Sequence, residues 1–258
     1  MNHYKNIIIT GASSGIGKAL AIEYSQNCHN LLLIGRNINN LKITKQQCHK
    51  NCNIILAKAD VKNFQDTNKY INSFDNNFPV DLIIANAGIS AGTGTKGENL
   101  AQLKEIYDIN IYGVINCIYP LIDKMRQRET GHIAIMSSMS AFTPIPSAPA
   151  YSSSKQCVSF LGLALREDLK KSKVKLSVIY PGFIKTPMTD ANKFKMPLLM
   201  DVEKAAKKII KDLSKNKTKI IFPKRIYYIT RIFNLFPSII KQIIYDKTPA
   251  KDNLSEEI

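Results

Sequence analysis

The stretch from residue 6 to residue 17 limits the fold of this chain more than any other part of the sequence. A β-branched run over residues 6–10, Asn-Ile-Ile-Ile-Thr, is typical of a buried parallel strand. It leads directly into a G-x-x-x-G-x-G loop from Gly11 to Gly17, and a helical pattern follows. Such a unit binds phosphate, because glycines admit a pyrophosphate close to the backbone and the helix N-terminus offers free N–H groups. We therefore expect an α/β fold built around a nucleotide-binding turn.

A second pattern indicates acid–base chemistry. Tyr151 and Lys155 lie four residues apart, so on a helix their side chains share one face. A phenol has a reference pKa of about 10 and is a poor acid at neutral pH. An ammonium group one turn away stabilises the phenolate, and lowering the phenol pKa to about 7 requires roughly 4 kcal/mol of differential interaction. We interpret the pair as a tuned proton donor and acceptor.

Further motifs follow in a fixed order along the chain. They are Thr10 before the glycine loop, Asn86-Ala87-Gly88 after a buried strand, Asn110 within Ile-Asn-Ile-Tyr-Gly, Ser138 thirteen residues before Tyr151, and Pro181-Gly182 with Thr186. Together with the glycine spacing and the Tyr-x-x-x-Lys pattern, they resemble the short-chain dehydrogenase/reductase family over about residues 5–222.

The resemblance implies an α/β fold with one doubly wound Rossmann-type catalytic domain over residues 1–222. Its seven-stranded parallel sheet would have the strand order 3-2-1-4-5-6-7, with helices on both faces. We expect strands over residues 6–10, 31–34, 53–61, 81–85, 131–138, 175–180 and 219–222, and one long helix over residues 100–128. Residues 223–258 form a C-terminal basic amphipathic extension in this interpretation.

The family resemblance also implies the reaction and the catalytic roles. It predicts reversible hydride transfer between a nicotinamide cofactor and a carbonyl or alcohol, with no metal. Tyr151 would be the general acid and base, and Lys155 would lower its pKa and hold the nicotinamide ribose. Ser138 would polarise the substrate carbonyl. Asn110, at a local helix kink, would hold a water molecule that links the lysine to solvent.

The same resemblance predicts how the cofactor binds. Arg36 stands where a member that prefers NAD carries an acidic residue, and guanidinium can fork onto a 2′-phosphate. Arg36 and Asn37 therefore favour NADP(H), with NAD(H) as the alternative. Asp60 is expected to bond the adenine amino group or to cap the helix near Asn63. The full predicted cofactor set is Gly11, Ser13, Ser14, Gly15, Ile16, Gly17, Arg36, Asn37, Asp60, Val61, Asn86, Ala87, Gly88, Tyr151, Lys155, Pro181, Gly182, Ile184 and Thr186.

Apolar residues around the catalytic motif indicate an apolar substrate. Residues 187–200 carry Met and Phe and are typical of a substrate lid. The predicted substrate set is Ser138, Phe142, Ile145, Phe183 and Met188. Steroids, acyl thioesters, retinoid-like molecules and small aldehydes all fit this interpretation.

The composition limits which binding partners and which cellular location we expect. A formal charge of +16 suggests nucleic acid or an anionic membrane. No nucleic-acid-binding motif occurs and the aromatic residues are not interleaved with the basic ones, so we expect no nucleic-acid function. The five cysteines form no C-x-x-C pair, which favours reduced thiols over a zinc site. With no signal-peptide layout and no apolar run of ~20 residues, we expect a cytoplasmic protein.

The last predicted segment departs from compact relatives. Residues 222–245 interleave Ile, Phe and Tyr with Lys224, Arg225, Arg231 and Lys241, and Pro237 is expected to divide them into two helices. Such a stretch lies on an anionic membrane surface, caps the substrate pocket or contacts a partner subunit. We favour protein contacts, and we expect a homodimer or homotetramer.

Two other classes compete with a dehydrogenase. Residues 11–15 also satisfy G-x-S-x-G, the nucleophile elbow of α/β-hydrolases. Only one strand precedes this loop, and His29, His49 and His132 do not stand where a late triad loop would place a histidine. A catalytically silent nucleotide sensor or scaffold on the same fold is the second alternative. The intact set of Asn110, Ser138, Tyr151 and Lys155 argues against it.

Overall fold

The structure is a computed structural model that describes residues 4–94, 97–190, 192, 194, 196–246 and 251–252. The bounds of its elements are β1 Asn6–Thr10, α1 Gly15–Ser25, β2 Asn30–Gly35, α2 Ile38–Gln47, β3 Asn53–Lys58, α3 Phe64–Asn77, β4 Leu82–Ala85, α4 Leu100–Tyr107, the π-helical turn η1 Asp108–Tyr112, α5 Gly113–Arg128, β5 His132–Met136, the 3-10 turn η2 Met139–Phe142, α6 Pro149–Leu169, the 3-10 turn η3 Lys170–Ser172, β6 Lys175–Pro181, α7 Pro187–Asp190, α8 Val202–Leu213, β7 Lys219–Phe222, α9 Lys224–Phe233 and α10 Ser238–Tyr245. Residues 191, 193 and 195 of the predicted lid, and residues 247–250 and 253–258 of the predicted extension, lie outside the described residues.

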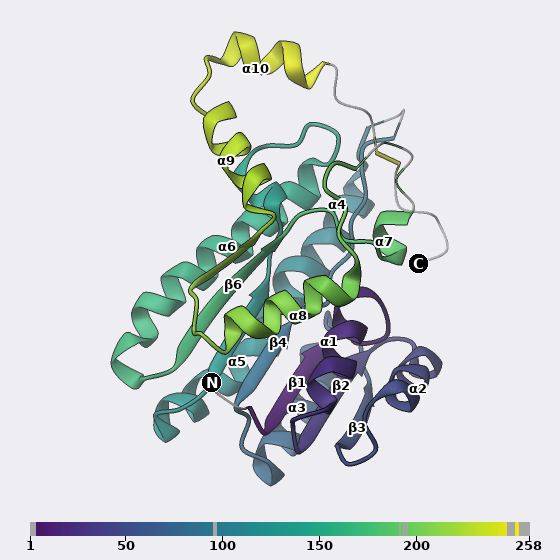
Figure 1. Cartoon of the computed structure of the whole chain (residues 1–258), viewed down its shortest axis with the longest axis vertical. Helices are drawn as coiled ribbons and strands as arrows, with labels where there is room; N and C mark the ends of the chain where they lie inside the picture. The colour runs from purple at the N-terminus through teal and green to yellow at the C-terminus, as the bar shows by residue number, and fades with distance from the viewer. Residues whose placement is uncertain are drawn as a thin grey trace.

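Seven parallel strands form one sheet, in the order β3-β2-β1-β4-β5-β6-β7 (Figure 1). This is the predicted order, and the predicted fold class is confirmed. Neighbouring strands pair in register, so that Ile8 of β1 lies between Leu32 of β2 and Ile83 of β4. The order reverses direction between β1 and β4, which opens a crevice at the carboxyl ends of these two strands.

Helices bury both faces of the sheet because successive strand residues point to opposite sides. Ile8 packs into a core that includes side chains from α3, α5 and α6. Its neighbours Ile7 and Ile9 pack into a second core that includes side chains from α1, α2 and α8. Burial on both faces explains why the strands are continuous apolar runs rather than alternating ones.

The predicted helix over residues 100–128 is not α-helical throughout. It consists of α4 and α5 joined by the π-helical turn η1, which contains Asn110. The Asn110 side chain is fully buried and bonds the backbone of Ile89 and the Ser154 hydroxyl. A π turn inserts an extra residue into a helix and often marks a functional position. The π turn falls at the position where the sequence predicts a local kink, and helical residues run from Leu100 to Arg128 as predicted.

The C-terminal segment divides at Pro237 into α9 and α10, as predicted. The two helices project beyond the sheet (Figure 1). Contact with the body is made through the ring of Tyr227, 4.9 Å from that of Phe142, and through Asn234, which donates to the Phe142 carbonyl at 2.6 Å. No residue of either helix is buried. Within the described part of the chain, no helix combines the length and the apolar character needed to cross a bilayer.

His132 is the first residue of β5, so it lies at the end of the strand away from the crevice. Its ring nitrogens bond the hydroxyls of Tyr4 and Ser177, each at 2.7 Å. Burial, with a smaller contribution from Lys175, lowers the pKa of His132 from 6.5 to about 3. The folded protein therefore stabilises the neutral form of the His132 imidazole over the charged form.

This burial predicts a pH-dependent loss of stability. The folded pKa lies below the unfolded one, so the stabilisation is complete above pH 6.5 and is lost as the pH falls toward 3. Between pH 6.5 and pH 4 the wild type should lose roughly 3 kcal/mol more unfolding free energy than His132→Gln. Urea denaturation at several pH values measures this difference. His29→Gln, at an exposed histidine, is the control, and identical pH profiles for wild type and His132→Gln would contradict the prediction.

Candidate active site

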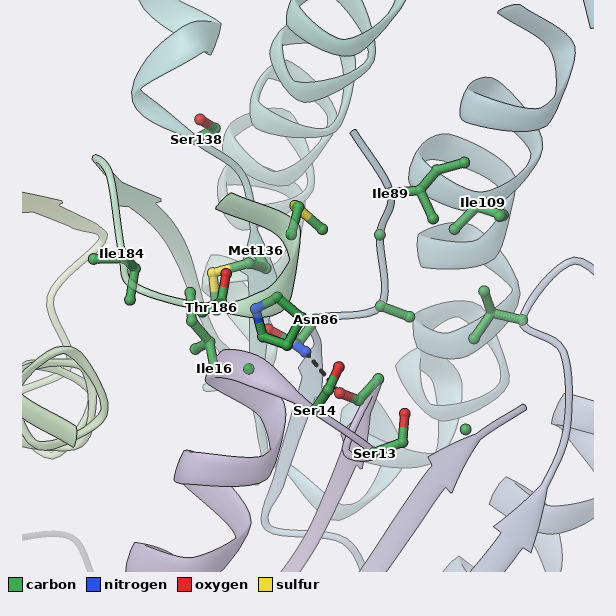
Figure 2. A pocket seen from close by; sticks show the side chains of 18 of the residues that line it. Ser13, Ser14, Ile16, Asn86, Ile89, Ile109, Met136, Ser138, Ile184 and Thr186 are labelled. Atoms are coloured by element: carbon green, nitrogen blue, oxygen red, sulfur yellow. Dashed lines mark hydrogen bonds between the residues drawn. The ribbon is translucent and has the colours of Figure 1, made fainter. Parts of the chain in front are cut away.

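A cleft of about 400 Å³ lies across the carboxyl ends of the central strands. Its lining side chains come from the loop after β1, the segment after β4 and the segments after β5 and β6 (Figure 2). Every predicted cofactor residue except Gly17 lines it, as do Ser138 and Met188. Residues that the sequence analysis did not single out also line it, and these are Gly35, Ala59, Ile89, Ile109, Met136, Ser137, Pro187 and Thr189.

The glycine loop is fastened to the end of β4. The Thr10 hydroxyl accepts hydrogen bonds from the backbone N–H groups of Asn86 and Ala87, both at 3.0 Å. The Asn86 amide donates back to the Thr10 carbonyl at 2.9 Å, so Asn86 links the ends of β1 and β4. Gly17 lies behind this junction, where an added Cβ would come within 2.3 Å of the Gly11 carbonyl oxygen. Gly17 thus shapes the loop without lining the cleft.

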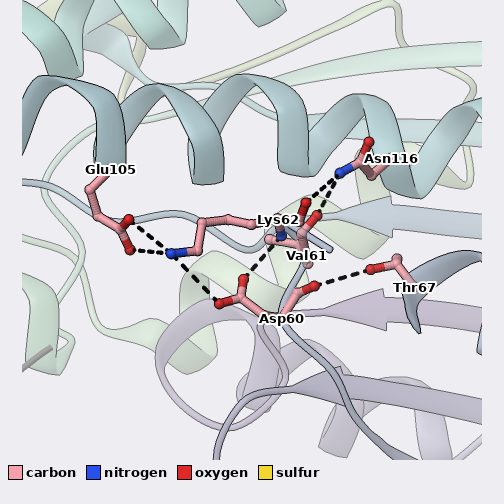
Figure 3. Close-up of polar contacts among 6 residues, drawn as sticks. All are labelled: Asp60, Val61, Lys62, Thr67, Glu105 and Asn116. Carbon is pink, nitrogen blue, oxygen red and sulfur yellow. Dashed lines mark hydrogen bonds and ion pairs between the residues drawn. The ribbon is translucent and has the colours of Figure 1, made fainter. Parts of the chain in front are cut away.

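One end of the cleft is built by the residues after β3 (Figure 3). The Asp60 carboxylate accepts the backbone N–H of Lys62 at 3.0 Å, and the Lys62 ammonium forms an ion pair with Glu105 at 2.8 Å. The Asn116 amide of α5 donates to the Val61 carbonyl at 2.9 Å. Asn63, not Asp60, caps α3. Asp60 is therefore held at the cleft wall rather than used as a helix cap.

The predicted residues after β2 lie at the same end. Arg36 is exposed and lines the cleft. Asn37 also lines it, and its side-chain oxygen caps α2 by accepting the backbone N–H of Asn40 at 3.0 Å. The cap fixes the direction in which the chain leaves β2.

The other end of the cleft holds Tyr151, Lys155 and Ser138. Tyr151 and Lys155 lie in the first two turns of α6, and Ser138 follows β5. The Lys155 ammonium is buried, lies 5.9 Å from the centroid of the Tyr151 ring and donates to the Met136 carbonyl at 3.1 Å. The structure therefore brings together the three groups that the sequence motifs single out.

Burial dominates the protonation of this cluster. It lowers the pKa of Lys155 to about 8. It also raises the pKa of Tyr151, and hydrogen bonds with Ser138 and Ser140 lower it by less. Burial leaves the pKa of Tyr151 above its usual value in the protein alone, and the lowering of this pKa by Lys155 stays a prediction. The desolvation of a buried phenol outweighs the hydrogen bonds, and the ammonium sits over the ring with its proton directed at Met136.

Asn110 lies behind the cleft instead of lining it. Its amide donates to the Ile89 carbonyl at 3.0 Å and the Ser154 hydroxyl at 3.1 Å, and its oxygen accepts the Ile89 N–H at 2.9 Å. A Cβ added at Gly88 would come within 3.0 Å of that oxygen and 3.1 Å of the Lys155 ammonium nitrogen. Asn110 and Lys155 therefore flank the same glycine.

Three of the predicted substrate residues are not brought into the cleft. The Phe142 ring stacks on Tyr180 with centroids 4.7 Å apart and contacts Tyr227, so it anchors α9. Ile145 is half-buried outside the lining, and the Phe183 ring contacts Phe194 with centroids 6.0 Å apart. Spacing from the catalytic motif predicts proximity along the chain but not the direction in which a loop turns.

Two hydroxyl residues of the site have no motif that would reveal them. Thr189 on α7 donates to the Ile184 carbonyl at 2.6 Å and accepts the Thr186 N–H at 2.9 Å, which ties the lid to the segment after β6. Ser140 is buried beside Tyr151, and its hydroxyl interacts with the phenol and lowers the pKa of Tyr151. No group of three His, Cys, Asp or Glu side chains in the described ranges is placed to hold a metal ion.

Comparison with known proteins gives a consistent result. A sequence profile described as short chain dehydrogenase matches residues 5–196. An uncharacterized oxidoreductase of Myxococcus xanthus is 29% identical over 237 residues, which span 91% of this chain and 94% of that protein. The 11-beta-hydroxysteroid dehydrogenase-like 2 protein of Arabidopsis thaliana is 30% identical over 258 residues, which span 94% of this chain and 82% of that protein.

Solved structures share the fold. A short-chain dehydrogenase/reductase from Burkholderia phymatum in complex with NAD superposes with a TM-score of 0.82 over 99% of this chain and 100% of that chain, at 21% identity. A Tyr-to-Phe variant of ElxO with NADPH bound has a TM-score of 0.73 over 80% of this chain and 90% of that chain, at 25% identity. Since the family profile spans most of the chain and the relatives align over most of their length, the chain belongs to the short-chain dehydrogenase/reductase family of oxidoreductases.

Proposed function

We propose that this protein transfers hydride reversibly between NADP(H) and a carbonyl or alcohol substrate. The observation that carries the proposal is the convergence of Tyr151, Ser138 and Lys155 at one end of a cleft whose floor is the glycine loop. Related structures hold NAD or NADPH, which supports a nicotinamide cofactor. A bound cofactor would supply the hydride chemistry, and the protein would supply orientation and the proton.

The cleft fits an extended dinucleotide. Gly11 and Gly15 carry no side chain at its floor, and a Cβ at Gly15 would lie 3.3 Å from the Thr186 methyl carbon on the opposite wall. The N-terminus of α1 opens onto this narrow part and offers free backbone N–H groups to a pyrophosphate. Asp60 stands at one end for the adenine, and Ile184 and Thr186 stand at the other for the carboxamide.

The chain's own residues provide the proton chemistry. In carbonyl reduction the Tyr151 hydroxyl donates its proton to the substrate oxygen, and the raised pKa of the phenol keeps that proton available at neutral pH. The Ser138 hydroxyl donates a second hydrogen bond to the same oxygen and stabilises the charge that develops there. Lys155 positions the ribose, and a water held at Asn110 would return a proton through Lys155 to the site.

Tyr151→Phe tests the proton donor. We expect a loss of kcat of about 10²–10⁴-fold, because the variant lacks the acid but keeps the ring and its packing. Equilibrium NADPH binding, read by the fluorescence of the bound nicotinamide, should stay within about twofold. Tyr107→Phe is the matched control, since its hydroxyl contacts Ser153 at 2.9 Å and Tyr107 does not line the cleft.

Undiminished turnover by Tyr151→Phe of aldehydes or ketones would contradict the assignment of the acid. A different failure would support the non-enzymatic alternative. In that case the wild type would bind NADPH tightly but reduce none of a broad panel of aldehydes and ketones.

Arg36 is proposed to select NADP(H) over NAD(H). The support is its exposed position in the cleft wall directly after Gly35, where no acidic residue follows β2. In Arg36→Ala, kcat/KM for NADPH should fall about tenfold or more, because a charge-assisted contact with the 2′-phosphate is lost. The value for NADH should stay within about threefold and serves as the internal control. Equal losses with both cofactors would refute a role in selection.

We propose an apolar substrate and a homo-oligomeric enzyme as well. Met188 is 41% exposed at the cleft wall, which supports an apolar contact with the substrate. Tyr112 in η1, Tyr119 on α5 and Phe160 on α6 are also exposed, and they supply an apolar surface for a dimer or tetramer. Sedimentation velocity measures this assembly directly.

We also propose a cytoplasmic location for this protein.

The C-terminal helices support peripheral contact with an anionic membrane. Apolar side chains on α9, α10 and the turn between them are exposed, and they are Tyr228, Ile229, Ile232, Leu235, Phe236, Ile239, Ile240, Ile243 and Ile244. Basic residues are interleaved with them, and the whole chain carries a formal charge of +16. The sequence pattern favours protein contacts, but no residue of α9 or α10 is buried against the body. An exposed basic and apolar surface suits anionic lipid headgroups.

Vesicle sedimentation tests the membrane contact. The wild type should pellet with phosphatidylserine-containing vesicles and not with pure phosphatidylcholine vesicles, because charge attraction adds to apolar burial. The double variant Ile239→Glu, Ile243→Glu should reduce the bound fraction at least severalfold. Ile43→Glu, at an exposed isoleucine of α2, is the control for added negative charge. Equal binding by all three proteins would argue against the contact.

A further inference from the structure

The C-terminal segment returns to the catalytic end of the molecule after α10. Lys251 and Asp252 lie along the loop between β4 and α4. The backbone N–H of Gly92 donates to the Asp252 carbonyl at 2.7 Å, and that of Gly94 donates to the Lys251 carbonyl at 2.8 Å. Two backbone hydrogen bonds therefore fasten the segment in a defined register.

Lys251 fits against the loop because residue 92 is a glycine and has no side chain. A Cβ added at Gly92 would come within 2.2 Å of the Lys251 carbonyl oxygen and 2.3 Å of the Lys251 Cβ. Contacts this short exclude any larger residue at position 92 while the segment is in place. The loop and the segment fit together closely at this point.

The loop is in turn joined to the helix that carries Tyr151. The Gln102 amide donates to the Gly92 carbonyl at 2.8 Å and to the Glu98 carboxylate at 2.9 Å. The same carboxylate accepts the backbone N–H of Ala150 at 3.0 Å, one residue before Tyr151. The docked segment is thereby held in a fixed position relative to the start of α6.

This docking places a second cation beside the catalytic tyrosine. The Lys251 ammonium lies 5.6 Å from the centroid of the Tyr151 ring and donates to the Ser90 hydroxyl at 2.6 Å. Burial lowers the pKa of Lys251 to about 8. No carboxylate forms an ion pair with it within the described ranges of the chain. Lys251 is partly buried, and a partly desolvated cation without a paired carboxylate suits an anion supplied by a ligand.

We propose that Lys251 selects carbonyl substrates that carry a carboxylate on the carbon next to the reacting carbonyl group. The inference rests on the proposed function, in which the Tyr151 hydroxyl fixes the position of the carbonyl oxygen. One ammonium group and the Ser90 hydroxyl match a singly charged carboxylate, whereas a phosphate group with up to two charges needs more donors. The apolar contact at Met188 then serves the rest of the substrate, so the substrate class is an oxo acid with an apolar body.

Benzoylformate and its methyl ester test this inference, because the two share one ketone and differ in charge. With NADPH and the full chain, the wild type should prefer benzoylformate. Lys251→Met should lower kcat/KM for benzoylformate about tenfold or more, mainly through KM, because a charge-assisted contact is removed. The value for the ester should stay within about twofold. Lys251→Arg keeps the charge and should retain most of the preference.

Gly92→Ala provides an independent variant that leaves the lysine in the sequence. Its methyl group should displace the segment and reproduce the loss of preference for benzoylformate. Equal losses on both substrates in Lys251→Met would mean that the lysine acts on Tyr151 rather than on the substrate. Equal gains would mean that the segment only obstructs the site. Either result, or an unchanged preference in Gly92→Ala, overturns the proposal.

A binding measurement separates this proposal from the proposed function. Benzoylformate is titrated calorimetrically into Tyr151→Phe saturated with NADPH, where no turnover is expected. Binding that weakens about tenfold or more when Lys251→Met is added supports the lysine even if no carbonyl compound is ever reduced. Absence of benzoylformate binding, in an enzyme that reduces the methyl ester, overturns the role of Lys251 and leaves the oxidoreductase function intact.

Discussion

The junction between β1 and β4 is the constraint on which the site depends. At this point the strand order changes direction, and the Thr10 hydroxyl and the Asn86 amide tie the two strand ends together. Because the junction is closed by hydrogen bonds, the glycine loop has one path, and Gly17 is small enough to let α1 approach it. The cleft, the free N-terminus of α1 and the wall that faces Thr186 all follow from this single arrangement.

Desolvation governs the chemistry that the cleft supports. Burial raises the pKa of Tyr151 and lowers those of Lys155 and Lys251 to about 8, so the charged forms of all three are disfavoured. A protonated phenol suits the proposed carbonyl reduction, in which Tyr151 would give up a proton. Both lysines lie within 6 Å of its ring centroid, at 5.9 and 5.6 Å, and each donates to an oxygen atom other than the phenol. Both lysines are therefore placed to contact a ligand that binds beside Tyr151, and not only Tyr151 itself.

The fold could be predicted from the sequence because each strand is a continuous apolar run ending at a motif, and the motifs fix the strand order. The residues that line the cleft were predictable for the same reason, since they follow strand ends. Phe142 could not be placed, because its direction depends on contacts with Tyr180 and Tyr227, far along the chain. Lys251 was equally hidden, since its position depends on a fit against Gly92 across 159 residues of sequence. A contact between residues far apart in the chain leaves no pattern in the sequence around either residue.

A crystal structure of the complex with NADPH tests the central claim most directly. We expect the pyrophosphate to lie on the glycine loop and the adenosine 2′-phosphate to lie at Arg36. We expect the nicotinamide ring to pack beside Tyr151 and Ser138, with its reactive carbon facing both hydroxyls. A nicotinamide bound outside the cleft, or one whose reactive carbon faces away from Tyr151 while the rest of the cofactor is ordered, would contradict it.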